Sequence, residues 1–155
     1  FVSERQFISE DVIFDIDYLS KCNCVVAIPE PVYFYCVNPN SLSKVFRTDR
    51  FNKVKKLYKE IIKKLIPIYG EEVSNRRGDR FLLARARTNA RQIIRHEKII
   101  GKNKMMKALH NICEDQDMNE IFQRYPIHLL PLKYRLVAYL MKYRCYHLLK
   151  IILGR

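Results

Sequence analysis

The chain has 155 residues, of which 48% are hydrophobic and 29% charged, and its formal net charge is +13. This composition excludes a disordered polyelectrolyte and predicts a compact globular unit rich in helix. The large positive charge favours an acidic partner such as nucleic acid, anionic lipid or a phosphorylated sugar. Because the chain begins at Phe1 and its opening residues lack the pattern of a signal peptide, we expect it to be a piece of a longer protein.

The charge is distributed unevenly. Residues 1–46 contain three basic and six acidic side chains, a balance of −3, so the remaining 109 residues must carry +16. This asymmetry predicts two functional regions, an acidic one over 1–46 and a basic helical one over 47–155. The five cysteines are odd in number and irregularly spaced, which favours reduced thiols in a cytosolic setting and no metal site.

The first predicted element is a short amphipathic helix over residues 9–21, where apolar side chains recur at helical spacing and Ser9 can act as the cap. Two runs of β-branched and aromatic residues follow, at 25–28 and 32–37, separated by the sequence Pro-Glu-Pro. These runs predict two short strands. The acidic region is therefore expected to be a small α/β remnant of one helix and two strands.

The rest of the chain predicts a bundle of about four to five helices, so the expected fold class is mainly α. A long helix should follow Thr48 or Asp49 and end between Pro67 and Gly70, with most lysines opposite its apolar face. The other expected helices cover residues 79–100, 103–113, 117–124 and a last stretch from 132 to about 154.

Residues 7–14, with the sequence FISEDVIF, precede the first strand, and residues 30–43, with the sequence EPVYFYCVNPNSLS, follow it. In order and spacing this pattern resembles family 2 glycosyltransferases of the GT-A fold. In that family a Glu-Asp pair opens a helix that faces the acceptor, and its aspartate is the usual catalytic base. The resemblance places the role of base on Asp11, and it gives Glu10 either the orientation of the turn or an acceptor contact. It also implies that residues 1–46 are the C-terminal, acceptor-side piece of a catalytic domain.

The chemistry of inverting sugar transfer requires a carboxylate that removes the proton of the acceptor hydroxyl as its oxygen attacks the anomeric carbon. A helix N-terminus favours an ionised carboxylate, which suits Asp11. Acids in a first helical turn are also common for this structural reason alone, so the surrounding pattern decides the interpretation. In similar enzymes, basic and hydroxyl groups after the second strand hold the donor diphosphate, which implies candidate contacts at Ser41, Ser43 and Arg47.

Two features depart from the family pattern. Many relatives have an arginine where this chain has Cys36, so Arg47 or Lys44 would have to neutralise the diphosphate. The chain also lacks a nucleotide-binding βαβ half, and its one Asp-x-Asp sequence, at 15–17, falls in a helix, where side chains two residues apart diverge. The nucleotide and a divalent Mg²⁺ or Mn²⁺ ion are therefore expected in a missing N-terminal half, with no cofactor in this chain. The isolated chain is expected to be inactive.

The basic region has two notable faces. Arg80, Arg87, Arg91 and Arg95 are seven, four and four residues apart and form one helical stripe suited to phosphate groups, although a merely solvated face has the same spacing. Residues 131–155 contain six basic and no acidic side chains among many apolar ones, and their uncharged runs are too short to span a bilayer. This segment predicts either an interfacial helix or a helix partly buried against its neighbours.

Together these features predict the C-terminal part of an inverting nucleotide-sugar glycosyltransferase, acting in bacterial surface polysaccharide synthesis at the cytoplasmic face of the plasma membrane. Its expected partners are the sugar nucleotide, a glycan or lipid-linked acceptor and the membrane surface. An alternative hypothesis is a basic helical module that binds nucleic acid or only assembles with other chains. Nucleic acid is the less favoured partner because no recognition motif or aromatic stacking platform is present. The donor sugar, the linkage and the oligomeric state do not follow from the sequence.

Overall fold

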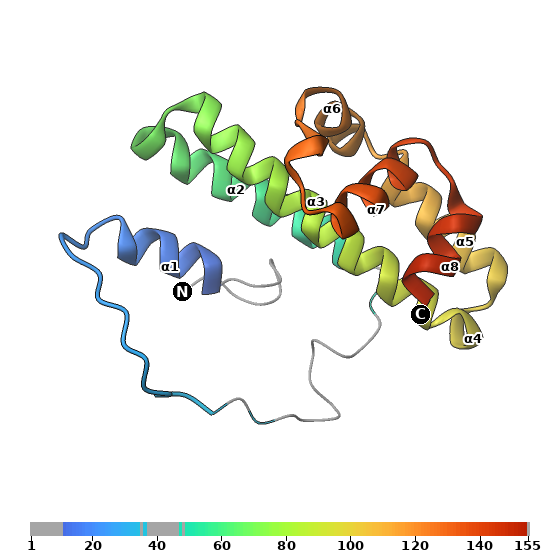
Figure 1. The fold of residues 1–155 in the computed structure, drawn as a ribbon, viewed down its shortest axis with the longest axis horizontal. Coiled ribbons are helices and arrows are strands. Elements are labelled where there is room, and N and C mark those ends of the chain that lie inside the picture. Colours follow the sequence, from blue (N-terminus) through green and yellow to red (C-terminus); the bar gives the residue numbers. More distant parts are fainter. Residues whose placement is uncertain (1–10, 35, 37–46, 48, 155) are drawn as a thin grey trace.

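The computed structural model describes residues 11–34, 36, 47 and 49–154. Within these residues the protein is mainly α-helical, as predicted, with eight α-helices and one 3-10 turn. In chain order they are α1 (Asp11–Leu19), α2 (Arg50–Tyr69), α3 (Glu71–Arg95), α4 (Glu97–Ile100), α5 (Lys102–Cys113), α6 (Gln116–Arg124), η1 (Ile127–Leu129), α7 (Leu132–Lys142) and α8 (Tyr146–Gly154). Figure 1 shows α2 and α3 as two long neighbouring helices, with α5–α8 gathered along α3.

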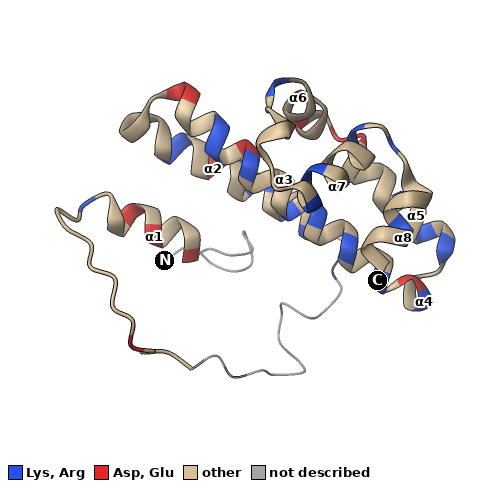
Figure 2. Cartoon of the chain, viewed as in Figure 1, with Lys and Arg blue, Asp and Glu red and all other residues tan. Residues whose placement is uncertain are grey.

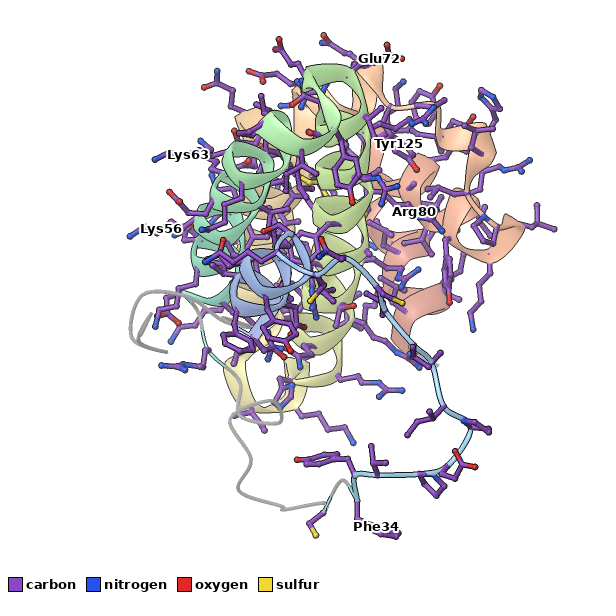
Figure 3. All side chains as sticks on the ribbon, turned by 90° about the vertical axis from the view of Figure 1, so that its left-hand side faces the viewer. Phe34, Lys56, Lys63, Glu72, Arg80 and Tyr125 are labelled. Carbon is purple, nitrogen blue, oxygen red and sulfur yellow. The ribbon has the colours of Figure 1, made fainter. Side chains whose placement is uncertain are left out.

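The predicted apolar face of α2 is buried against α3, α1 and α6. Its fully or nearly buried side chains are Phe51, Val54, Leu57, Tyr58 and Ile61. Lys56 and Lys63 point away from the other helices, as Figure 3 shows. The helix ends within the predicted interval because Gly70, with a φ of +76°, donates its N–H to the carbonyl of Ile66 at 2.9 Å.

The predicted start of α3 at Asp79 is wrong, because α3 begins at Glu71, directly after Gly70. Gly78 lies inside the helix, where a Cβ would stand 2.6 Å from Cγ1 of Ile62 on α2. Asp79 is 2% exposed and pairs with Arg124 of α6. A glycine followed by an acid resembles a helix boundary in the sequence, yet here both residues serve the close contact of α3 with its neighbours.

The shorter helices agree well with their predicted bounds. α5 and α6 each begin one residue before the prediction and end where it placed them. The helix predicted to run to Ile100 is instead divided at His96 into α3 and α4, and α4 ends at the predicted Gly101, which has a φ of +85°.

The single helix predicted after Pro131 is also divided. α7 ends at Lys142, Arg144 adopts a left-handed φ of +57°, and the chain turns back into α8. This turn brings Leu149 and Leu153 of α8 into the core, with 0% and 7% exposure. A straight helix would have carried these two side chains away from α3, so burial of apolar surface favours the break.

The two predicted strands are not present in the described part of the segment. Residues 25–34 and 36 form no strand, and residues 35 and 37 lie outside the described residues. Val26, Val32 and Phe34 are 77%, 78% and 83% exposed, and Figure 3 shows Phe34 far from the helices. A β-strand needs a neighbouring strand to satisfy its backbone groups, and none is available among the described residues. Local β-propensity alone therefore does not make a strand of residues 25–28, and the strand predicted over 32–37 lies in part outside the described residues.

Candidate functional site

Asp11, the predicted catalytic base, is the first residue of α1 and is exposed to solvent. Its Oδ1 accepts a hydrogen bond from the N–H of Val12 at 3.0 Å. This position leaves the carboxylate accessible to a reactant while the free amides of the first turn favour its ionised form. Glu10, Ser41 and Ser43 lie outside the described residues, so the structure does not show how they stand relative to Asp11.

α1 is held on the basic region by an apolar cluster and an ion pair. Ile13, 5% exposed, packs with Leu57 and Ile61 of α2. Lys64 of α2 donates to both carboxylate oxygens of Asp17, at 2.6 and 2.8 Å. Figure 2 shows the complementary charges, with acidic residues on α1 and basic residues along α2. The helix that carries Asp11 therefore has a defined place on the helical body.

Arg47, the predicted diphosphate contact, lies on a different part of the molecule. Its guanidinium is 3.8 Å from Asp49, and it lines a cavity of about 290 Å³ between α2, α3 and α5. Lys104 and Lys107 of α5 line the same cavity, together with Asn89 of α3. No residue of α1 lines it. The structure thus does not bring Arg47 together with Asp11.

The described residues do not form a metal site. They contain no group of three or more His, Cys, Asp or Glu side chains placed to share an ion. Asp15 and Asp17 are two positions apart on α1, so their side chains diverge, and Asp17 is paired with Lys64. The divalent ion implied by the glycosyltransferase resemblance therefore does not fit the part of the chain that the structure describes.

The four predicted arginines occupy one stripe of α3. Arg80, Arg91 and Arg95 are exposed and Arg87 is partly buried. Among the described residues, no carboxylate lies within ion-pair distance of these four guanidinium groups. Arg76 and Arg77 are also exposed in the first half of α3, because the helix starts earlier than predicted. The stripe is therefore electrostatically available to an external anion.

A slot of about 160 Å³ lies between α3 and α7, and we call it the α3–α7 slot. Its two walls are residues of α3 and residues of α7 that follow the same sequence spacing, and the segment before α7 closes the slot. The lining residues are Arg80, Leu83, Ala84 and Arg87 of α3, Tyr134, Val137, Ala138 and Met141 of α7, and Leu130 with Pro131. The guanidinium of Arg87 lies over the ring of Tyr134, 3.7 Å from its centroid. Sequence reasoning found the arginines but missed the slot, because matching spacings do not reveal which two helices meet.

The last two helices combine burial with exposed apolar surface. No helix among the described residues has the length and hydrophobicity needed to cross a bilayer. Leu132, Leu136 and Tyr143 are 77%, 50% and 67% exposed, and their spacing places them on one side of α7 and its end. Lys142 and Lys150 hold the tail to the body, donating to the carbonyl of Phe122 and to Glu97. Partial burial against the neighbouring helices, one of the two predicted alternatives, is therefore present in this segment, and the interfacial helix stays a prediction.

A polar cluster around the buried Asp79 joins α2, α3 and α6. Arg124 donates to both oxygens of Asp79, at 2.8 and 2.7 Å, and Tyr58 donates to Asp79 at 3.0 Å. The hydrogen bond to Asp79 raises the pKa of Arg124, while burial and then the Asp79 charge raise the pKa of Tyr58. The three side chains satisfy one another's hydrogen bonds, so this cluster holds the three helices together.

Comparisons of the chain with models of protein families, with curated proteins and with solved structures found no match.

Proposed function

We propose that this chain is the C-terminal part of an inverting nucleotide-sugar glycosyltransferase, in which α1 presents the catalytic base and the helical body contacts an anionic membrane surface. Residues 1–46 would belong to the catalytic domain on its acceptor side, and residues 47–155 would form the basic helical domain. The sugar nucleotide and its divalent cation would be held outside this chain.

The observation that carries the catalytic part is the position of Asp11 within the pattern of residues 7–43. The carboxylate is exposed at the N-terminus of a helix whose other side is fixed by Ile13. In the proposed step Asp11 accepts the proton of the acceptor hydroxyl while that oxygen bonds to the anomeric carbon. The bond from this carbon to the nucleotide diphosphate breaks at the same time, which inverts the configuration.

Two features support membrane contact. The arginine stripe of α3 carries four cationic groups without an ion-pair partner among the described residues. The outer side of α7 exposes Leu132 and Leu136, next to the exposed Lys133. Apolar side chains that enter the lipid boundary beside cations that reach the phosphates are typical of interfacial helices. Such contact suits an acceptor that is lipid-linked, and it suits the surface polysaccharide role.

The test of the enzyme hypothesis uses the full-length protein. Asp11→Asn should abolish sugar transfer and leave nucleotide binding intact, because the amide keeps the size of the side chain but cannot accept the proton. Asp15→Asn is the matched control, since Asp15 is an exposed acid one turn later on the same helix. Sugar transfer retained by Asp11→Asn, or lost equally in both variants, would remove Asp11 as the base.

The arginine stripe, which has no ion-pair partner within the described ranges, also favours a second candidate function, non-specific binding of nucleic acid. Binding to anionic vesicles and to duplex DNA, measured across a salt series, separates the two. We expect affinity for the vesicles with an apolar contribution that persists at high salt, because salt screens charges but not buried hydrocarbon. Steep salt-dependent DNA binding without vesicle affinity would overturn the membrane proposal.

A further inference from the structure

We infer that the α3–α7 slot binds one molecule of an anionic membrane lipid, with the phosphate at Arg80 and Arg87 and the first methylenes of an acyl chain between the helices. This inference rests on the proposed membrane contact and gives it a specific ligand. It predicts one stoichiometric site in addition to the diffuse attraction of a basic surface.

The slot exists because each of its two helical walls has a small side chain near the centre. The lining residues of α3 and those of α7 both follow the spacing i, i+3, i+4 and i+7, which places each set on one side of its helix. In both sets the third member is alanine, Ala84 on α3 and Ala138 on α7. Larger residues at these two positions would fill the space between the helices, as they do elsewhere in a packed core.

The walls and the ends of the slot differ in character. Leu83, Val137 and Met141 give the middle an apolar wall, and no carboxylate of the described residues lines the slot. Arg80 and Arg87 are seven residues apart, which separates their backbones by about 10.5 Å along α3. Figure 3 shows Arg80 on the side of α3 that faces α7. The two guanidinium groups therefore flank an apolar space about two helical turns long.

Neither guanidinium is neutralised by a carboxylate in the part of the chain that the structure describes. The described residues place no carboxylate within ion-pair distance of Arg80 or Arg87, although Asp79 is adjacent in sequence, because Asp79 is committed to Arg124. Arg87 is oriented by its contact with the Tyr134 ring. An arginine held in this way can form paired hydrogen bonds to phosphate with less loss of conformational freedom.

The combination favours a lipid over a free phosphate or a nucleic acid. Free phosphate would use the arginines but leave the apolar walls wet, and a nucleic acid backbone has no chain that fits between two helices. A volume of about 160 Å³ is close to the roughly 150 Å³ apolar cavity that accommodates benzene. The slot is thus large enough for several methylenes and not for a whole acyl chain, so the rest of the chain would remain in the membrane.

The experiment measures calorimetric binding of dioctanoyl phosphatidic acid, kept below its micellar concentration, to the whole chain. We expect one site, and the double variant Arg80→Gln/Arg87→Gln should weaken binding about tenfold or more, since charge-assisted hydrogen bonds are lost. Arg91→Gln/Arg95→Gln removes the same charge from the same helix outside the slot and should change the affinity less than about twofold. Equal effects of the two pairs would overturn the inference.

A second pair of variants tests the apolar part of the site. Ala84→Leu fills the slot from an exposed position, so the fold should be kept. It should weaken lipid binding about as strongly as Arg80→Gln/Arg87→Gln does. Thr88→Leu, on the next turn and outside the slot, is its control. If inorganic phosphate competes at the same concentration as the lipid, or if Ala84→Leu binds normally, the slot is not a lipid site.

The failure of this inference can be told apart from the failure of the membrane proposal. Vesicles of phosphatidylcholine with and without one-fifth phosphatidic acid report membrane contact for the wild-type chain. If these vesicles bind wild type and Arg80→Gln/Arg87→Gln equally, membrane contact stands and the slot is refuted. If dioctanoyl phosphatidic acid binds in the slot but no vesicle does, the site stands and the membrane proposal falls.

Discussion

The N-terminal region and the helical body of this protein differ in how much apolar surface each of them buries. Ile13 is the one buried residue of α1, and the segment over 25–34 exposes nearly all of its apolar side chains. In the body, α2 to α8 share a continuous apolar core, with a satisfied polar cluster around Asp79 inside it. The resemblance to an enzyme lies in the first region, whereas almost all of the stability must come from the second.

Because of this difference, mutations in the two regions should affect stability in different ways. A change in the body should lower the stability of the whole molecule, because its helices share one core and unfold together. A change in α1 should release that helix and little else. The predictions below use this contrast, beginning with the largest expected effect.

The largest effect is expected from Arg124→Met. This change keeps the apolar stem of the side chain but leaves Asp79, 2% exposed, without its cation. Removing one partner of a buried ion pair typically costs about 3–5 kcal/mol, and we expect about 3 kcal/mol because water can reach this partly exposed arginine. Urea unfolding followed by circular dichroism measures the loss.

Two further variants make that test decisive. Arg76→Met removes an exposed arginine of α3 and should change stability by less than about 0.5 kcal/mol. Asp79→Leu combined with Arg124→Met removes both charges and should recover part of the loss. A destabilisation below about 1 kcal/mol for Arg124→Met would show that the polar cluster does not hold the body together.

A smaller loss in the free energy of unfolding should appear as the pH rises. Burial raises the pKa of the Cys113 thiol to about 12, whereas an unfolded cysteine ionises near pH 8.5. Above about pH 8.5 the unfolded state releases the thiol proton and the folded state retains it. The contribution of this group to the free energy of unfolding is therefore fully present below that pH and is lost progressively towards pH 12. The expected slope is up to about 1.4 kcal/mol per pH unit from this group.

Unfolding free energies at pH 8, 9 and 10 in a reducing buffer measure this slope. Cys113→Val keeps a buried apolar side chain of similar size without an ionisable group, so its stability should fall less steeply over the same range. Tyr58 and Tyr146, whose pKa values are raised mainly by burial, add to the loss only above about pH 10 in both proteins. Identical slopes for the two proteins below pH 10 would contradict the prediction.

The sequence predicted the helices of the body where the apolar period decided them, as in α2, α5 and α6. It failed where the partner of a residue is distant in the chain. Asp79 looks like a helix start until Arg124, 45 residues later, occupies its carboxylate. The break at Arg144 likewise depends on the gain from packing α8 on α3. For the candidate site, the local pattern is enough to predict Asp11 as the base, which stays a prediction, whereas the α3–α7 slot depends on which faces of two helices pack together.

The smallest effect on global stability is expected from Ile13→Ala, which tests how α1 is attached. Alanine favours helix but removes most of the side chain that packs with Leu57 and Ile61. We expect amide hydrogen exchange to rise across residues 11–19 while α2–α8 keep their protection, with a global loss of only about 1 kcal/mol. Phe14→Ala is the control, because Phe14 is larger but 63% exposed on the same helix.

The same variant sharpens the functional contrast between the two regions. In the full-length protein, Ile13→Ala should lower sugar transfer, since Asp11 would no longer be held in place, and should leave binding to anionic vesicles unchanged. No residue of the cluster around Ile13 is an arginine of the stripe or lines the α3–α7 slot among the described residues, so both should keep their local geometry. If exchange rises throughout α2–α8, or if vesicle binding falls together with transfer, the two regions are one cooperative unit and the proposed division of roles is wrong.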